Sequence, residues 1–95
     1  MKAYVILDID VKDQAGYDEY KKVGAATLGL YGAKPLARGG KTEIMEGDWQ
    51  PKRVVMLEFE NMDSAKKWWN SPEYARAKKL RHAAASTNVV FLEGI

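Results

Sequence analysis

The chain has 95 residues, of which 46% are hydrophobic and 29% charged, a composition typical of one globular domain over residues 1–95. Its 15 basic and 13 acidic side chains leave a net charge of +2, which indicates neither a nucleic-acid nor a membrane partner. The absence of cysteine excludes disulfides, thiolate nucleophiles and Cys-containing zinc sites.

The sequence also allows expectations about metal binding and about the cellular compartment of the protein. Because His82 is the only histidine, we expect no His-rich metal site within one chain, and we expect no bound cofactor. The sequence opens on a strand-like run without the basic region, apolar core and cleavage site of a leader, so we expect a cytoplasmic protein. No apolar run approaches the length of a transmembrane helix.

The first two predicted elements are a strand and a helix. Residues 3–9 (AYVILDI) are rich in β-branched and aromatic side chains and end at a charged corner, which is typical of a strand. Asp13 can cap the helix that follows, and Gly32 provides the left-handed stop expected at its end. Between them, a semi-apolar stripe recurs at helical spacing: Tyr17, Tyr20, Val23, Thr27 and Leu30.

A hairpin is predicted for the middle of the chain. Residues 33–45 indicate a second strand interrupted at Gly39 and Gly40, where a bulge or bend would redirect the side chains. Residues 46–52 (EGDWQPK) are typical of a loop, and residues 53–60 (RVVMLEFE) give the clearest strand in the sequence.

Two helical segments and a strand complete the pattern. Asn61 or Asp63 can cap a short helix, and Ser71 followed by Pro72 restarts the helix for a second half. Residues 87–93 (TNVVFLE) favour a final strand. The order β-α-β-β-α-β predicts an α+β, ferredoxin-like fold, in which a four-stranded antiparallel sheet carries both helices on one face.

The predicted strands are apolar on both sides near their middles. A sheet with one solvated face should alternate apolar and polar residues, so the face away from the helices needs a cover. Burying six such side chains would contribute roughly 1.5 to 3 kcal/mol each, before the entropy cost of association. A homodimer through the sheet face is the simplest cover, because a self-complementary patch needs no other protein. The side chains predicted on this face are Tyr4, Ile6, Val54, Met56, Val89 and Phe91.

An ordered series of short segments runs through most of the chain. These are YGAK at 31–34, RGG at 38–40, EGDW at 46–49, LEF at 57–59, WWNSPEY at 68–74 and LEG at 92–94. The series resembles the family called domain of unknown function 1330. This resemblance implies a ferredoxin-like protomer of the dimeric α/β-barrel superfamily, in which two sheets pack into a barrel-like dimer. Superfamily relatives include cofactor-independent monooxygenases, haem-degrading enzymes, muconolactone isomerases and chlorite dismutases, so no single reaction is implied.

The first candidates for ligand binding are Arg38 and Ser71. Arg38 precedes two glycines, where its guanidinium could hold a carboxylate or enolate at two points; an ion pair with Glu58 or Asp8 is the structural alternative, which we favour. Ser71 lies at the helix restart, whose free amide groups could bind an anion, although capping explains this residue without a ligand.

The other ligand-binding candidates are Tyr20, Trp49, Tyr74 and Arg81. Tyr74 and Arg81 share one side of their predicted helix with Lys78, which would suit an anionic ligand in a cleft. We expect that side to be a solvated face. Tyr20 could line a pocket between helix and sheet, and for both Tyr20 and Trp49 the alternative is ordinary core packing.

His82, Glu58 and Asp8 are the candidates for acid–base chemistry. His82 is the only side chain whose ordinary titration lies near neutrality, but no orienting carboxylate lies at helical spacing, so we expect a surface histidine. Glu58 and Asp8 should lie on the back of neighbouring central strands, where two carboxylates could share a proton unless Arg38 neutralises them.

Three functions are compatible with these residues. The first is binding of a small organic molecule, which the arginines allow to be anionic, in an apolar cleft between sheet and helices. The second is a cofactor-independent oxygenase or isomerase that uses the same cleft, with His82 or a carboxylate as base. The third is an RNA-binding module of the same element order, which we set aside because the strand at residues 53–59 lacks the required aromatic pair and carries Glu58.

Overall fold

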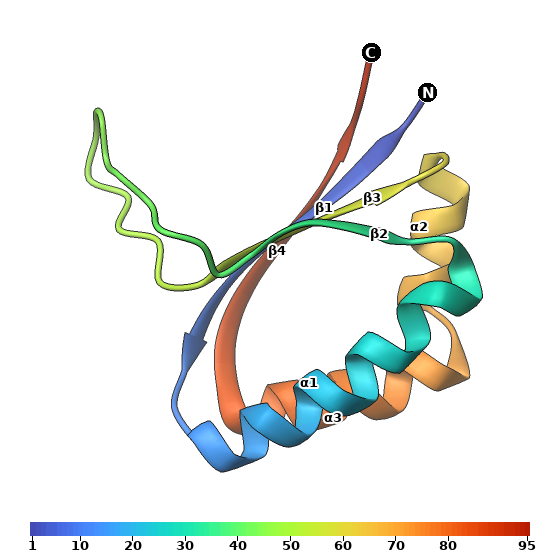
Figure 1. The fold of residues 1–95 in the computed structure, drawn as a ribbon, viewed down its shortest axis with the longest axis horizontal. Helices are drawn as coiled ribbons and strands as arrows, with labels where there is room; N and C mark the ends of the chain where they lie inside the picture. Colours follow the sequence, from blue (N-terminus) through green and yellow to red (C-terminus); the bar gives the residue numbers. More distant parts are fainter.

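The computed structural model describes all 95 residues and has the order of strands and helices that the sequence predicts. Its four strands are antiparallel and lie in the order β2-β3-β1-β4, with the helices on one face (Figure 1). The α+β, ferredoxin-like fold class is thus confirmed. The elements are β1 (Ala3–Val11), α1 (Gln14–Leu28), a 3-10 turn (Gly29–Tyr31), β2 (Lys34–Arg38), β3 (Val54–Phe59), α2 (Met62–Trp69), α3 (Pro72–Ala84) and β4 (Ala85–Glu93).

The predicted helix ends are confirmed by side-chain caps. The Asp13 carboxylate accepts a hydrogen bond from the Gly16 amide, and Asn61, rather than Asp63, caps α2. Ser71 accepts from the Tyr74 amide at 3.1 Å at the start of α3. Each such cap stabilises its helix by about 1 kcal/mol, because it satisfies an amide that the helix leaves free. None of the helices is long and apolar enough to cross a membrane.

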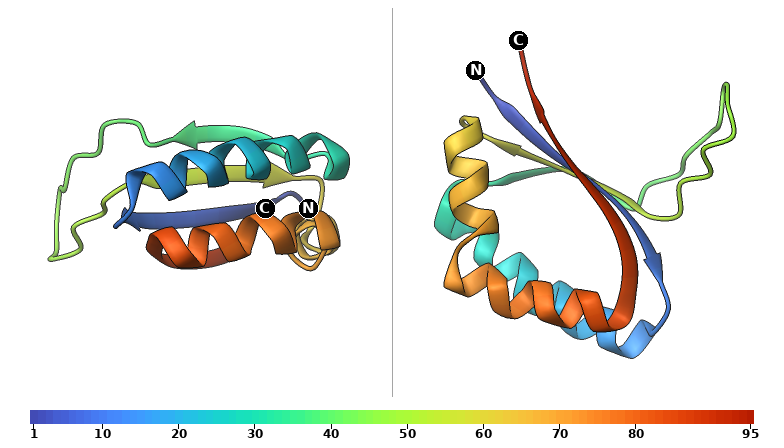
Figure 2. Two further views of the ribbon diagram at one scale, coloured as in Figure 1. Left: turned by 90° about the horizontal axis from the view of Figure 1, so that it is seen from below. Right: turned by 180° about the vertical axis from the view of Figure 1, so that it is seen from behind.

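The core lies between the helices and the side of the sheet that we call the inner face. Val5, Leu7 and Ile9 alternate along β1 and are at most 1% exposed, as the two-residue period of a strand requires. Trp68 of α2 packs on Phe59 of β3, with ring centroids 5.4 Å apart. Figure 2 shows α1 and α3 side by side as one layer against the sheet.

The second strand is shorter than predicted, since β2 ends at Arg38 and residues 40–53 form a loop that projects from the sheet (Figures 1 and 2). Gly39 has a φ of +70°, and a Cβ there would overlap the guanidinium of Arg53. The register shift lies between Pro35 and Ala37 instead of at the glycines. Because β3 begins only at Val54, the segment predicted to continue β2 has no strand to pair with.

The opposite side of the sheet, which we call the back face, differs from the prediction in β4. Antiparallel pairing sets Phe91 beside Val5 and Val89 beside Leu7, so both side chains point to the inner face. Val90 and Leu92 lie on the back face, where they are 58% and 54% exposed. The alternation in β4 was predicted correctly but its phase was wrong. The apolar back-face residues are Tyr4, Ile6, Val54, Met56, Val90 and Leu92.

The helix side that carries Tyr74 and Arg81 was predicted to be solvated, and this is wrong. Tyr74 is fully buried and Arg81 is 2% exposed, because this side of α3 turns toward the core. The guanidinium carbon of Arg81 lies 5.8 Å from the ring centroid of Trp69, and the Lys78 ammonium lies 4.0 Å from it. Favourable cation–π contacts thus accompany the burial of Arg81 and the partial burial of Lys78.

Candidate functional site

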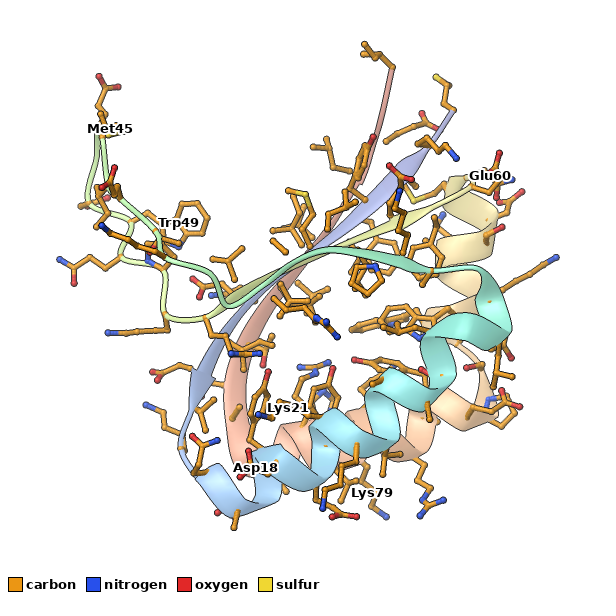
Figure 3. All side chains as sticks on the ribbon, viewed as in Figure 1. Asp18, Lys21, Met45, Trp49, Glu60 and Lys79 are labelled. Carbon is orange, nitrogen blue, oxygen red and sulfur yellow. The ribbon has the colours of Figure 1, made fainter.

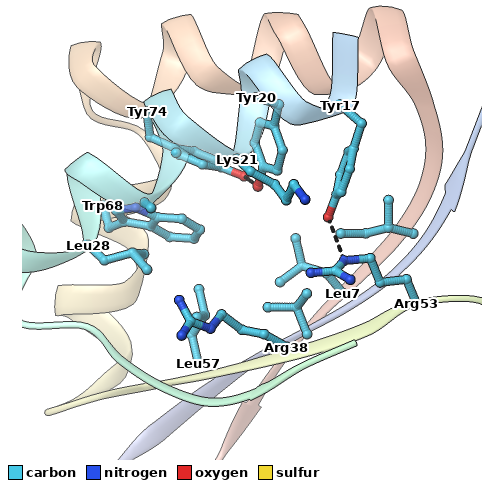
Figure 4. Close-up of a pocket in the computed structure, with 14 residues that line it drawn as sticks. Leu7, Tyr17, Tyr20, Lys21, Leu28, Arg38, Arg53, Leu57, Trp68 and Tyr74 are labelled. Atoms are coloured by element: carbon cyan, nitrogen blue, oxygen red, sulfur yellow. Dashed lines mark hydrogen bonds between the residues drawn. The ribbon is translucent and has the colours of Figure 1, made fainter. Parts of the chain in front are cut away.

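A cleft of about 270 Å³ opens between the inner face and α1, and ten of its 14 lining residues are hydrophobic. Leu7 and Leu57 contribute from the sheet, whereas Tyr17 and Leu28 contribute from α1 and Trp68 from α2 (Figure 4). This volume lies near the lower end of the range for small-molecule pockets, which is roughly 300 to 1,000 Å³. A ligand of one or two rings would fit.

Arg38 points into this cleft from the end of β2 (Figure 4). It pairs with Val55 of β3, which places its side chain on the inner face, and it forms no ion pair. The expected pairing with Glu58 or Asp8 is wrong because both carboxylates lie on the back face. The guanidinium of Arg38 therefore has its donors available for a ligand.

Arg53 is a second cleft arginine, which the sequence analysis did not single out. Its Nε donates to the Tyr17 hydroxyl at 3.0 Å, and its guanidinium carbon lies 5.6 Å from the Tyr17 ring centroid (Figure 4). The signal was present in the sequence, because Arg53 precedes Val55, Leu57 and Phe59 at the two-residue spacing of the inner face.

The charged side chains that line the cleft are all positive. Lys21, Arg38 and Arg53 line it, whereas no aspartate, glutamate or histidine does. Lys21 was also missed by the sequence analysis; it lies one helical turn after Tyr17, and its ammonium is 3.2 Å from Asp18 at the cleft margin (Figure 3). Because the walls are apolar, these cations favour an anion more strongly than they would in open water.

Two predicted residues, Tyr20 and Tyr74, meet in the helix-side wall, where their hydroxyl oxygens lie 2.9 Å apart (Figure 4). Burial raises the pKa of Tyr20 far above the usual value for a tyrosine, and the neighbouring Tyr74 hydroxyl raises it further. Tyr20 therefore stays protonated and acts as a hydrogen-bond donor rather than a base. The rings of Tyr74 and Trp68, with centroids 4.0 Å apart, continue the wall.

Arg81 lies behind this wall, outside the lining of the cleft. Its guanidinium carbon is 6.0 Å from the Tyr20 ring centroid, and its Nε and Nη2 are buried without a hydrogen-bond partner. Burial lowers the pKa of neighbouring Lys78, and the charge of Arg81 lowers it further. Arg81 thus adds uncompensated positive charge behind Tyr20 without touching the cleft.

The other ligand-binding candidates lie away from the cleft. Ser71 is buried as the cap of α3, where its hydroxyl donates to the Trp68 carbonyl at 2.7 Å. Trp49 lies on the projecting loop between Met45 and the sheet (Figure 3) and is 60% exposed. Its Nε1 donates to Asp8 at 2.9 Å. Trp49 and Asp8 line a separate polar hollow near the end of the sheet.

The acid–base candidates are not brought together. His82 is exposed on α3, whereas Asp8 and Glu58 both lie on the back face. Glu58 pairs with Tyr4, four residues from Asp8 along β1, so the two carboxylates are roughly 13 Å apart by strand rise. No group of three or more histidine, cysteine, aspartate or glutamate side chains is arranged to hold a metal ion.

Solved structures with a similar fold share little sequence with this chain. A protein of unknown function from Rhodopseudomonas palustris has a TM-score of 0.80 at 16% identity, with 99% of this chain and 82% of that chain covered. A dimeric ferredoxin-like protein of unknown function from Jannaschia sp. CCS1 has a TM-score of 0.72 at 14% identity, with 99% and 100% covered. SnoaB, a cofactor-independent oxygenase from Streptomyces nogalater, has a TM-score of 0.62 at 13% identity, with 99% and 93% covered.

These likenesses establish the fold alone, because fold similarity at such identity does not carry function. No protein with a curated description matches the chain. The family comparison is more specific, since one family matches residues 2–95, nearly the whole sequence. The chain belongs to the family described as domain of unknown function DUF1330.

Proposed function

We propose that this protein binds a small organic anion with an apolar, ring-shaped body in the cleft between sheet and helices. One observation carries the proposal: three cations and no carboxylate line a cleft whose other walls are mainly aromatic and aliphatic. An apolar body gains from burial against these walls, while the cations select a carboxylate, enolate or phenolate.

Arg38 is the residue we propose as the main anion contact. Its guanidinium has no ion pair that a ligand must displace, whereas Arg53 already donates to Tyr17 and Lys21 lies beside Asp18. A planar guanidinium can hold a carboxylate through two parallel hydrogen bonds, which is geometry that a lysine cannot supply. Arg53 and Lys21 then add positive potential around this contact.

Calorimetric titration with cinnamate and its neutral amide tests this proposal. We expect cinnamate to bind at least about tenfold more tightly, because a charged hydrogen bond contributes roughly 1.5 to 3 kcal/mol. Arg38→Met should remove this preference and retain most of the apolar stem. Arg76→Met is the matched control, since Arg76 is exposed on α3 and outside the cleft. Equal binding of acid and amide, or no change in Arg38→Met, would contradict the proposal.

A cofactor-independent oxygenase or isomerase is the second candidate. Solved proteins of this fold include the oxygenase SnoaB, and the cleft could hold an enolate beside Arg38. Binding ranks first because no histidine or carboxylate lines the cleft to remove a proton from a substrate. Oxygen consumption or isomer formation with cyclic enols, lost in Arg38→Met and retained in Arg76→Met, would reverse this order.

We also propose that the back face joins two copies of this chain. Its apolar residues are incompletely covered within one chain, with Val90 and Leu92 more than half exposed, and two solved proteins of similar fold are dimeric. Sedimentation should show a dimer that Val90→Glu dissociates, because a charge would be buried at the interface. Leu30→Glu is the control, since Leu30 is 65% exposed and lies off the sheet. A solitary wild-type subunit at micromolar concentration would contradict this assembly.

A further inference from the structure

The hydroxyl pair in the helix-side wall has one proton more than its internal bond uses. Tyr20 and Tyr74 each carry a single O–H, and one hydrogen bond of 2.9 Å joins the two oxygens. Neither hydroxyl forms another hydrogen bond in the fold, and the guanidinium of Arg81 faces the Tyr20 ring rather than its hydroxyl. The pair therefore holds one uncommitted O–H donor.

Burial decides which tyrosine holds that free donor. Tyr74 is 0% exposed, so a hydroxyl proton of Tyr74 without an acceptor would carry the full cost of removal from water. The Tyr74 hydroxyl therefore donates its proton to the oxygen of Tyr20. Tyr20 is only partly buried and lines the cleft, so its own proton is directed there. Donation from Tyr74 to Tyr20 is the one arrangement of this hydrogen bond that leaves no fully buried hydroxyl without an acceptor.

The charges around this donor all favour a negatively charged or polarised oxygen. Arg81 lies behind the Tyr20 ring on α3 and has no carboxylate partner. Lys21 of α1, Arg38 of β2 and Arg53, just before β3, are the charged residues on the remaining sides of the cleft. Figure 4 shows the arginine head groups on the sheet side and the tyrosine hydroxyls facing them from the helix side.

We infer that the Tyr20 hydroxyl is an oxygen-binding subsite, which donates to a carbonyl or phenolate oxygen of a ligand whose acidic group lies at Arg38. This rests on the proposed function and narrows its ligand to cyclic compounds with two oxygen functions at opposite ends. Hydroxy- or oxo-substituted ring carboxylates have that chemistry. Because Tyr20 remains protonated, it stabilises an oxyanion without removing a proton from the ligand.

The probe is para-coumarate, which has a carboxylate and a phenol at opposite ends and a phenolate band that absorbance can follow. We expect it to bind wild type at least about tenfold more tightly than para-methylcinnamate, which lacks the second oxygen. We also expect the pKa of its phenol to fall by at least about one unit on binding, because Tyr20 and the surrounding cations favour the phenolate.

Tyr20→Phe removes only the hydroxyl and should abolish most of this pKa fall, whereas the control Arg76→Met, outside the cleft, should leave the fall unchanged. Tyr74→Phe keeps the Tyr20 donor and should retain a reduced fall. Equal affinity for para-coumarate and para-methylcinnamate in wild type would overturn the inference without relying on any variant. A wild type that binds no cinnamate would instead overturn the proposed function, so the two failures are distinguishable.

Discussion

Gly39 allows the arrangement of Arg53 to be tested through the backbone. Gly32 and Gly39 both have a φ of +70°, but an added Cβ meets nothing within 4 Å at Gly32 and overlaps the Arg53 guanidinium at Gly39. Alanine at either position costs about 1 to 2 kcal/mol for the left-handed backbone. Only Gly39→Ala should also displace Arg53 from Tyr17.

The additional loss follows from the two contacts of Arg53. Its hydrogen bond to Tyr17 contributes roughly 0.5 to 1.5 kcal/mol and its cation–π contact about 0.5 to 1 kcal/mol. We therefore expect Gly39→Ala to reduce the free energy of unfolding by about 1 to 2.5 kcal/mol more than Gly32→Ala does. Urea denaturation at one fixed protein concentration measures the difference, because a dimer would make stability depend on concentration.

Combining each substitution with Arg53→Met completes this test. With the guanidinium removed, most of the difference between Gly39→Ala and Gly32→Ala should disappear, since only the backbone penalty and a 3.1 Å approach to the flexible side-chain stem at position 53 remain. The reasoning fails if the two alanine variants are equally destabilised when Arg53 is present, or if their difference persists in the Arg53→Met background. In the cleft, Gly39→Ala should also weaken cinnamate binding, because it moves one of the lining cations.

Three further substitutions test the core, a cap and an ion pair. Thr27→Val should lower the free energy of unfolding by about 1 to 3 kcal/mol, measured by urea denaturation, because the buried Trp68 Nε1 then lacks its acceptor at 2.9 Å. Thr27→Ser keeps the hydroxyl and should avoid most of this loss. Ser71→Ala should cost about 1 to 2 kcal/mol and Ser71→Asn less, and equal losses would argue against a capping role. The hydrogen bond from Lys2 lowers the pKa of Glu60, so its contribution is present at neutral pH and is lost as the pH falls through that lowered pKa. Glu60→Gln should therefore reduce the loss of stability on acidification, whereas Glu19→Gln, which removes a carboxylate with no ion pair, should leave it unchanged.

The sequence predicted best those features that depend on neighbouring residues. Asp13, Ser71 and Gly32 act within one helical turn, so their roles follow from local hydrogen bonding and backbone geometry. The inner-face alternation of β1 and β3 was also predicted correctly. The phase of β4 was not, because both of its sides are apolar and only pairing with β1, whose residues lie 74 to 90 positions earlier in the chain, decides which side meets the helices.

The site was only partly predictable for a related reason. Arg38, Tyr20 and Tyr74 were among the candidates from the sequence and line the same cleft in the fold, whereas Arg53, which precedes β3, was overlooked as the first residue of the predicted strand 53–60. Arg81 was expected in water because arginine is seldom buried without an anion. In the fold, the rings of Tyr20 and Trp69 come from other elements to meet its guanidinium, and no spacing within α3 could reveal them.

The position of β1 constrains how the protein can fold while it is being synthesised. This apolar strand lies between β3 and β4, and its residue Ala3 pairs with Phe59 and Glu93. Both partners emerge from the ribosome long after β1, so the strand has no sheet neighbour during most of translation. Such non-local pairing slows folding and leaves an apolar, unpaired strand exposed in the nascent chain. Early contact of β1 with α1 or with a chaperone would therefore limit aggregation before the sheet forms.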